Sequence, residues 1–244
     1  MKKAAFYTLG CKVNQYETEA MAELFADSGY EIKEFTEVAD VYVINTCSVT
    51  NMGDRKSRQI IRRAKKLNPN AVIAVTGCYA QTAPDEVLAI EGVNLVLGTK
   101  DRKNIVTLVE ELNTESNINH VSDIMSNHEF EELQIKQYSN RTRAFIKIQE
   151  GCNQFCSYCI IPYARGPVRS RAKDDVVREI KELAHNGFKE IILVGIHVAS
   201  YGVDLGDATL ESLIMDVDKI DGVERIRLSS IEPMTLNQEF IDSI

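Results

Sequence analysis

Apolar and polar positions alternate along the first 113 residues in a way that predicts a parallel β-sheet covered by helices. Residues 14–28 and 51–67 each carry apolar side chains on one helical face, and the first of these segments stops at Gly29, a usual helix end. Short apolar segments with the composition of strands lie at residues 4–9, 31–36, 41–45, 71–76 and 95–98. We therefore expect an N-terminal α/β domain with an open parallel sheet over residues 1–113.

The pattern is lost in residues 114–142, which are polar and acidic, with clusters of Asn, Ser, Glu and Asp. A segment of this length with little periodicity is typical of a connection between domains. We expect an interdomain linker there that carries short strands.

Strand and helix signals resume in residues 143–244. Strands are predicted at 144–149, 190–194 and 224–228, and helices at 174–186 and 209–220. With a third helix that has barely begun at Ile244, this pattern indicates three βα units of a barrel-like parallel sheet. A complete eight-unit barrel takes about 250 residues, so we expect only the first part of a barrel and a sequence that is part of a longer protein. A small α/β domain closed by dimerisation is the alternative.

Three of the cysteines follow predicted strands of the first domain. Cys11, Cys47 and Cys78 each lie one to three residues beyond the end of a strand. The carboxyl ends of parallel strands form one rim of a sheet, where ligands bind, so these cysteines can converge on one site. The alternative is that each is a small buried apolar side chain.

The other cysteines, Cys152, Cys156 and Cys159, follow a predicted strand with the spacing C-x3-C-x2-C. Zinc sites usually have paired Cys or His groups that supply four ligands, and the nearest histidines are not at ligand spacing. Three thiolates suit a 4Fe-4S cluster in which one iron has no protein ligand and binds a small molecule instead.

Composition and charge indicate where in the cell the protein is found and which partners it can bind. The chain has no apolar run of about 18 residues and no signal-peptide pattern, so we expect a cytoplasmic protein without a membrane partner. In a reducing compartment, thiolates or metal ligands are favoured over disulfides. A net charge of −8 gives no general affinity for nucleic acid, so RNA contacts must come from local basic patches.

Two basic groups offer such patches, with a solvated surface as the alternative for the first. One lies on the predicted helix 51–67, and the other follows Cys159. Their members are Arg55, Lys56, Arg58, Arg62, Arg63, Lys65 and Lys66 in the first group, and Arg165, Arg169, Arg171 and Lys173 in the second.

The second cysteine group, with Tyr158 before its last cysteine, resembles the defining motif of radical S-adenosylmethionine (SAM) enzymes. Further segments are similar to the methylthiotransferases of that superfamily: LGCKVNQYE from Leu9, NTC ending at Cys47, TGC ending at Cys78, CIIPYARG from Cys159, GIH from Gly195 and LSSIEP from Leu228. The fold that this implies is an N-terminal open parallel sheet with flanking helices, followed by the first half of a radical SAM partial (β/α) barrel.

The resemblance implies two 4Fe-4S clusters and SAM as cofactors. Cys152, Cys156 and Cys159 would hold the catalytic cluster, whose open iron binds SAM and whose chemistry gives a 5′-deoxyadenosyl radical. The first three cysteines would hold an auxiliary cluster, the site of the sulfur. Tyr158 would lie near the SAM adenine, and Gly195, Ser230 and Glu232, at or past strand ends, are candidates for cofactor binding, with turn formation as the alternative. His197 is a weaker candidate for the same pocket.

Residues 10–19 and 195–202 most resemble the branch that acts at C2 of N6-threonylcarbamoyladenosine next to the tRNA anticodon. This implies the tRNA anticodon loop and an external electron donor as partners. The rest of the barrel and an RNA-binding C-terminal domain lie outside this sequence, so activity is expected of the full-length enzyme and not of residues 1–244 alone. The alternatives are isopentenyladenosine in tRNA, an aspartate of a ribosomal protein, an Fe-S electron-transfer or scaffold protein, and a zinc-stabilised binding module.

Overall fold

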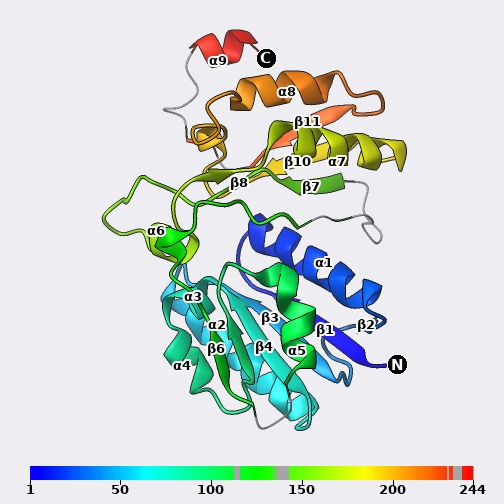
Figure 1. Ribbon diagram of the computed structural model, residues 1–244, viewed down its shortest axis with the longest axis vertical. Coiled ribbons are helices and arrows are strands. Elements are labelled where there is room, and N and C mark those ends of the chain that lie inside the picture. Colours follow the sequence, from blue (N-terminus) through cyan, green and yellow to red (C-terminus); the bar gives the residue numbers. More distant parts are fainter. Residues whose placement is uncertain (113–115, 134, 136–142, 230, 233–237, 244) are drawn as a thin grey trace. The chain divides into compact units, whose positions relative to one another are not determined.

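The computed structural model describes residues 1–112, 116–133, 135, 143–229, 231–232 and 238–243 (Figure 1). The chain forms two compact units. Unit 1 contains Met1–Asn127 together with Cys156–Arg165, and unit 2 contains His128–Phe155 together with Gly166–Ile244. No helix in the described part of the chain is both long enough and apolar enough to cross a bilayer.

Unit 1 is built on a parallel sheet in which all the predicted strands are present. The sheet has six strands in the order β2-β1-β3-β4-β5-β6. They are β1 (Lys3–Thr8), β2 (Glu31–Lys33), β3 (Val41–Thr46), β4 (Val72–Gly77), β5 (Leu95–Leu97) and β6 (Ile118–His120). The central pair, β3 and β4, runs in register from Val41 opposite Val72 to Thr46 opposite Gly77. The last strand, β6, lies within residues 114–142 and extends this sheet beyond β5.

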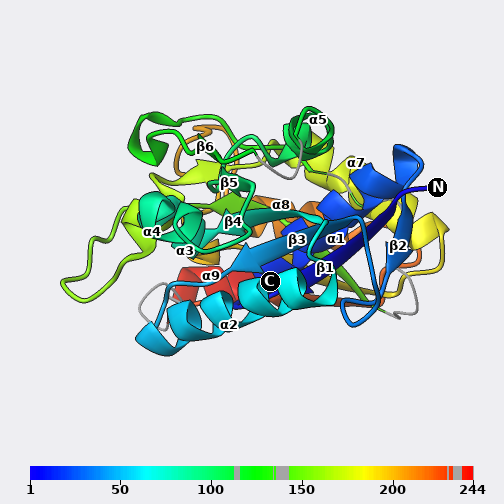
Figure 2. The same ribbon diagram turned by 90° about the horizontal axis from the view of Figure 1, so that it is seen from below.

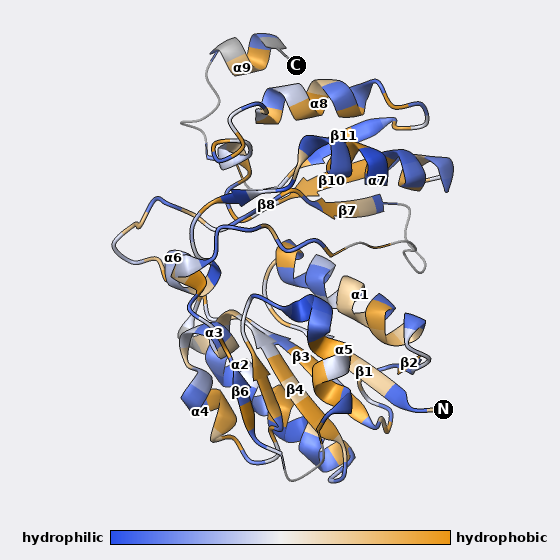
Figure 3. Ribbon diagram, in the orientation of Figure 1, coloured by the Kyte–Doolittle hydropathy of each residue, from blue (hydrophilic) through white to orange (hydrophobic). Residues whose placement is uncertain are grey.

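Helices cover both faces of this sheet, which explains why β3 is buried along its whole length. The helices α1 (Lys12–Asp27) and α5 (Ile105–Glu110) pack on one face. The other face is covered by α2 (Asn51–Leu67), α3 (Cys78–Thr82) and α4 (Pro84–Leu88). Figure 2 shows α2 and α5 on opposite sides of the sheet, and the apolar strands between them are orange in Figure 3. The predicted N-terminal α/β architecture is confirmed.

Unit 2 has a parallel sheet in the order β11-β10-β7, as expected for the start of a barrel. Its strands are β7 (Arg143–Lys147), β10 (Glu190–Val194) and β11 (Arg225–Leu228), and its helices are α7 (Lys173–His185), α8 (Leu210–Asp218) and α9 (Gln238–Ser243). The segment predicted as one strand, 144–149, is divided at Ile148. Beyond this residue β8 (Gln149–Glu150) pairs antiparallel with β9 (Arg169–Ser170) instead of continuing along β10.

Candidate metal centre

Cys11, Cys47 and Cys78 follow the carboxyl ends of three adjacent strands of unit 1. Cys11 caps the start of α1, Cys47 directly follows β3, and Cys78 follows β4 and opens α3. Because β1, β3 and β4 are neighbours, the three residues share one rim of the sheet. Cys78 is buried, Cys47 is half-buried and Cys11 is exposed. The rim position inferred from the sequence is therefore present in the structure.

Gly10 brings the loop of Cys11 against Cys47. Its φ of +100° lies in the region that favours glycine, and a Cβ at this position would lie 2.8 Å from the Cβ and 2.9 Å from the Sγ of Cys47. Because Gly10 has no side chain, the side chain of Cys47 can occupy this space. Cys78 follows β4, the strand next to β3, so it lies on the same rim as Cys47.

This close approach gives a prediction about stability. Gly10→Ala is expected to lower the free energy of unfolding by about 2–3 kcal/mol, because it adds a steric contact with Cys47 to the backbone strain. Gly29→Ala is the matched control, since Gly29 has a φ of +84° but a Cβ added there would meet nothing within 4 Å. That variant should lose only about 1 kcal/mol. Urea unfolding measures both values, and equal losses would contradict the proposed contact.

The donor atoms of this group are thiol sulfurs, which are soft ligands and suit iron-sulfur clusters. In the part of the chain that the structure describes, no three His, Cys, Asp or Glu side chains are arranged to hold a metal ion. A cluster of several irons requires a different arrangement of ligands from a single ion, because each thiolate binds a separate iron atom. The three cysteines on one rim, with glycine leaving space between two of them, fit a cluster of that kind.

A buried arginine from the CIIPYARG segment reaches Cys78. Arg165 ends α6 (Ile161–Arg165), a helix of unit 1, and its Nε donates to the Sγ of Cys78 at 3.3 Å. Its Nη1 donates to Oε1 of Glu17 at 2.6 Å, and its Nη2 donates to Oε2 at 3.2 Å. Glu17 and Arg165 are both 0% exposed. Burial raises the pKa of the Cys78 thiol, whereas the charge and hydrogen bond of Arg165 lower it.

Asn14 ties the cysteine loops to each other. Its Nδ2 donates to the carbonyl of Leu9 at 2.7 Å and to that of Thr46 at 2.9 Å, so it links the residues that precede Cys11 and Cys47. Sequence reasoning did not assign Asn14 or Glu17 to the site. The sequence does place Asn14 and Glu17 one helical turn apart, and this spacing could have indicated that they share a face of α1. In the structure both side chains are buried on that face.

The second basic group predicted to contact phosphates does not do so through its arginines. Arg165, Arg169 and Arg171 are at most 1% exposed. Arg171 pairs with Glu179, and Nη2 of Arg169 lies 3.8 Å from Oε2 of Glu150. Lys173 is instead paired with Asp216 at 2.8 Å and only partly covered. The prediction that this group contacts phosphates is therefore wrong for its three arginines, which are buried beside acidic side chains.

The C-x3-C-x2-C segment begins in unit 2 and continues in unit 1. Gly151 precedes Cys152 with a φ of +76°, and a Cβ there would lie 1.8 Å from the carbonyl oxygen of Pro167, so the chain requires glycine at this point. The Cys152 amide donates to the Gly166 carbonyl at 3.1 Å. In unit 1 the Cys159 amide donates to the Cys156 carbonyl at 2.9 Å, and Tyr158 between them is 91% exposed.

Two other predicted cofactor residues, Gly195 and Glu232, lie past the carboxyl ends of β10 and β11 in unit 2. Gly195 follows β10, and its amide donates to Oγ of Ser229 at 3.3 Å. His197 lies two residues further on, with its Nε2 3.7 Å from Oε2 of Glu232. The structure thus brings Glu232 to His197, while Ser230 lies outside the described residues. This is the end of a barrel at which active sites are built.

Comparison with known proteins matches both parts of the chain. Residues 3–98 match the model of "Uncharacterized protein family UPF0004", and residues 146–244 match that of the Radical SAM superfamily. A Bacillus subtilis protein named threonylcarbamoyladenosine tRNA methylthiotransferase MtaB is 52% identical, over 99% of this chain and 54% of its own length. An Aquifex aeolicus protein of the same name is 43% identical, over 99% of this chain and 59% of its own length.

A Sulfurihydrogenibium protein named tRNA-2-methylthio-N(6)-dimethylallyladenosine synthase is 37% identical, over 96% of this chain and 55% of its own length. The chain therefore spans about half the length of the curated relatives it matches. Among solved structures, the radical SAM methyltransferase TsrM from Kitasatospora setae has a TM-score of 0.65 at 15% identity, over 100% of this chain and 57% of that one. This last likeness concerns the fold.

Proposed function

Since this chain belongs to the radical SAM methylthiotransferase family, we propose that it is the two-cluster part of an enzyme that adds a methylthio group to C2 of N6-threonylcarbamoyladenosine beside the tRNA anticodon. The observation that carries the proposal is the position of Cys11, Cys47 and Cys78 on one sheet rim, in a chain with a separate C-x3-C-x2-C segment. Insertion of sulfur at an aromatic C–H bond needs both a radical and a held sulfur, and two cysteine groups provide for both.

When bound, the two clusters and SAM would supply a 5′-deoxyadenosyl radical and the sulfur that is transferred. Cys152, Cys156 and Cys159 would hold the SAM-binding cluster, and the ring of Tyr158 is exposed, as packing on an adenine requires. Cys11, Cys47 and Cys78 would hold the auxiliary cluster. Gly195, Ser230 and Glu232 would contact SAM at the carboxyl ends of the barrel strands. The electron needed to start the reaction would come from an external donor.

The choice of nucleoside follows the relatives. Identity is 52% and 43% with the two proteins named for threonylcarbamoyladenosine, and 37% with the one named for dimethylallyladenosine. The test supplies the full-length enzyme with SAM, a reductant and tRNA bearing one or the other modification, and measures the nucleosides by mass spectrometry. We expect the methylthio product only from threonylcarbamoyladenosine. Product only from the isopentenyl nucleoside would contradict the substrate, and no product from either would contradict the proposed function.

The helix α2 supports RNA as the partner. It carries seven Arg or Lys and a single Asp in a chain whose net charge is −8. Its exposed cations are Arg55, Lys56, Arg62, Arg63 and Lys66. None of these takes part in an ion pair within the part of the chain that the structure describes. Arg62 and Lys66 are like-charged neighbours one turn apart, an arrangement that destabilises a helix unless a polyanion offsets it.

The basic helix also starts at the proposed cluster site. Thr50 caps α2 by accepting a hydrogen bond from the Gly53 amide at 3.1 Å. Gly53 lies against the Cys47 carbonyl, since a Cβ there would be 2.7 Å from its oxygen. Phosphates bound along α2 would thus belong to a nucleic acid that reaches the rim of Cys47. We therefore assign the exposed face of α2 to the backbone of the tRNA.

This assignment predicts a change in salt dependence. Arg62→Gln/Arg63→Gln/Lys66→Gln is expected to reduce the slope of log Kd against log salt for a tRNA anticodon stem-loop by about 2–3, because each phosphate contact contributes about 0.7–0.9. Fluorescence anisotropy with the full-length protein measures the slope.

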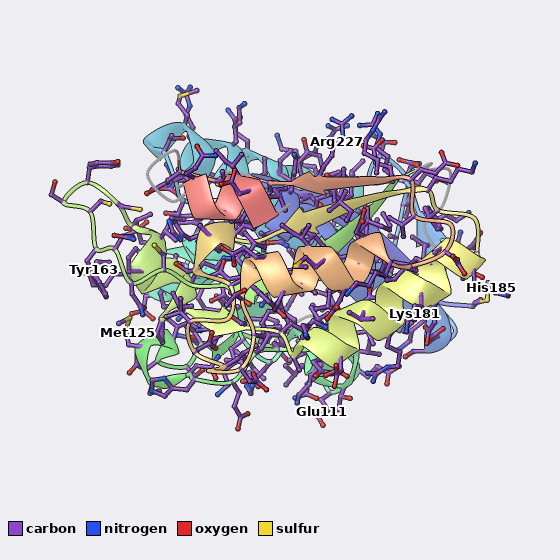
Figure 4. All side chains as sticks on the ribbon, turned by 90° about the horizontal axis from the view of Figure 1, so that it is seen from above. Glu111, Met125, Tyr163, Lys181, His185 and Arg227 are labelled. Atoms are coloured by element: carbon purple, nitrogen blue, oxygen red, sulfur yellow. The ribbon has the colours of Figure 1, made fainter. Side chains whose placement is uncertain are left out.

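The matched control removes the same charge elsewhere, in Lys2→Gln/Lys103→Gln/Lys181→Gln. All three lysines are exposed, and Lys181 points outward from α7 in Figure 4. The control should change the slope by less than about 1. Equal changes in both variants would mean that α2 is an ordinary solvated face.

A further inference from the structure

The guanidinium of Arg165 is fixed on one side and directed at a sulfur on the other. We propose that Arg165 is a positioning residue for the auxiliary cluster, which holds the Cys78 sulfur in place and donates a hydrogen bond to it when it binds iron. The inference rests on the proposed function, because it takes Cys78 as a cluster ligand. It adds a residue from the segment after Cys159 to the environment of the other cysteine group.

The geometry leaves the guanidinium little freedom. Its two Nη atoms donate to the two carboxylate oxygens of Glu17, and Nη2 also donates to Oδ1 of Asn14. An arginine fork is planar, so fixing both Nη atoms also fixes the direction of Nε–H. That direction is toward the Sγ of Cys78, at 3.3 Å. Asn14 Oδ1 also accepts from the Cys11 thiol at 3.7 Å, so one guanidinium contacts the surroundings of two cysteines.

A closed ring of buried contacts holds Glu17 and Arg165. Arg102 places Nη1 2.6 Å from Oε2 of Glu17, and its Nη2 donates to the Thr99 carbonyl at 2.6 Å. The Thr99 hydroxyl donates to the carbonyl of Ala164 at 2.7 Å, and Ala164 precedes Arg165 in the chain. Arg102, Glu17 and Arg165 are all 0% exposed. Buried and connected contacts of this kind favour one arrangement of the three side chains.

A hydrogen bond from a buried cation to a cluster sulfur has two measurable effects. It favours the more negative, reduced cluster and therefore raises the reduction potential. It also orients the ligand, and loss of such an outer contact typically weakens metal binding by about 10–100-fold. A residue that only stabilised the fold would produce neither effect selectively.

Arg102 provides the matched control for that distinction. It has the same residue type and the same burial, and it pairs with the same carboxylate as Arg165. The hydrogen bond to Cys78, however, comes from Arg165. Arg165→Lys and Arg102→Lys therefore both disturb the same network, and only the first removes a donor from the sulfur.

The experiment uses the chain with Cys152→Ala/Cys156→Ala/Cys159→Ala, so that iron reports on the auxiliary site. After anaerobic reconstitution, the reduction potential is measured by titration followed by electron paramagnetic resonance, and the rate of iron loss is measured with a chelator. We expect Arg165→Lys to lower the potential and to speed iron loss by about tenfold or more, with Arg102→Lys close to the parent. Equal effects of the two variants, or no effect of Arg165→Lys, would overturn the inference.

A second pair of variants applies if Arg165→Lys does not fold by circular dichroism. Glu17→Gln/Arg165→Gln removes the carboxylate and one arginine and leaves Arg102, whereas Glu17→Gln/Arg102→Gln leaves Arg165 beside Cys78. The same difference in potential and iron loss is expected between these two variants. A parent chain that binds no iron through Cys11, Cys47 and Cys78 would overturn the proposed function itself. Normal iron in the parent with no difference between the variants would overturn only the role of Arg165.

Discussion

Cys156→Ala is expected to abolish the reductive cleavage of SAM by the full-length enzyme, by at least about 100-fold, while iron remains at Cys11, Cys47 and Cys78. Cys156 is exposed, so its replacement removes a ligand without opening a cavity in the core. Two thiolates cannot hold the cluster that three would hold. The measurement is the yield of 5′-deoxyadenosine, together with iron and sulfide per chain.

The companion variant separates the two cysteine groups. Cys47→Ala should leave 5′-deoxyadenosine formation near the parent level and remove the methylthio product, because the radical and the sulfur depend on different clusters. Cleavage of SAM at the parent rate in Cys156→Ala would refute the role of C-x3-C-x2-C. Methylthio product from Cys47→Ala would refute the role of the sheet rim.

Glu17→Ala is expected to destabilise the fold by about 3–5 kcal/mol, the usual result of breaking a buried ion pair. The variant removes the carboxylate with which Arg165 and Arg102 both pair, and leaves two buried cations that cannot lose their protons. The free energy of unfolding from urea titration measures the effect. Glu31→Ala is the control, since the 2.5 Å pair of Glu31 with Lys33 is solvent-screened and its loss should cost much less than the loss of Glu17. Similar losses in the two variants would contradict the importance of the buried network.

Much of the fold could be predicted because its strands are apolar and its helices amphipathic. The segment 41–45 was recognisable as a strand buried on both faces, and its position fixed Cys47 at the sheet rim. Short strands were expected in residues 114–142, but the place of β6 and its pairing with β5 could not be found this way, because Ile118–His120 is exposed and lacks an apolar pattern. The division between β7 and β8 also escaped prediction, because it depends on β9, a partner strand of two residues.

The sequence was sufficient to predict the cysteine ligands of the site, but not the side chains that surround them. Cys11, Cys47 and Cys78 could be grouped because each follows a strand, and strand ends share a rim. Arg165 was predicted to be one of the cations that contact phosphates, since arginines are mostly exposed. Its burial depends on Glu17, which is 148 residues away in sequence. Spacing and periodicity report on local structure, so a pair formed over this separation gives no local signal.

The most direct test of the two-cluster proposal is the iron and acid-labile sulfide bound per chain after anaerobic reconstitution of residues 1–244. The proposal predicts about eight irons and about eight sulfides, as two 4Fe-4S clusters require. About four irons, or zinc in place of iron, would contradict it.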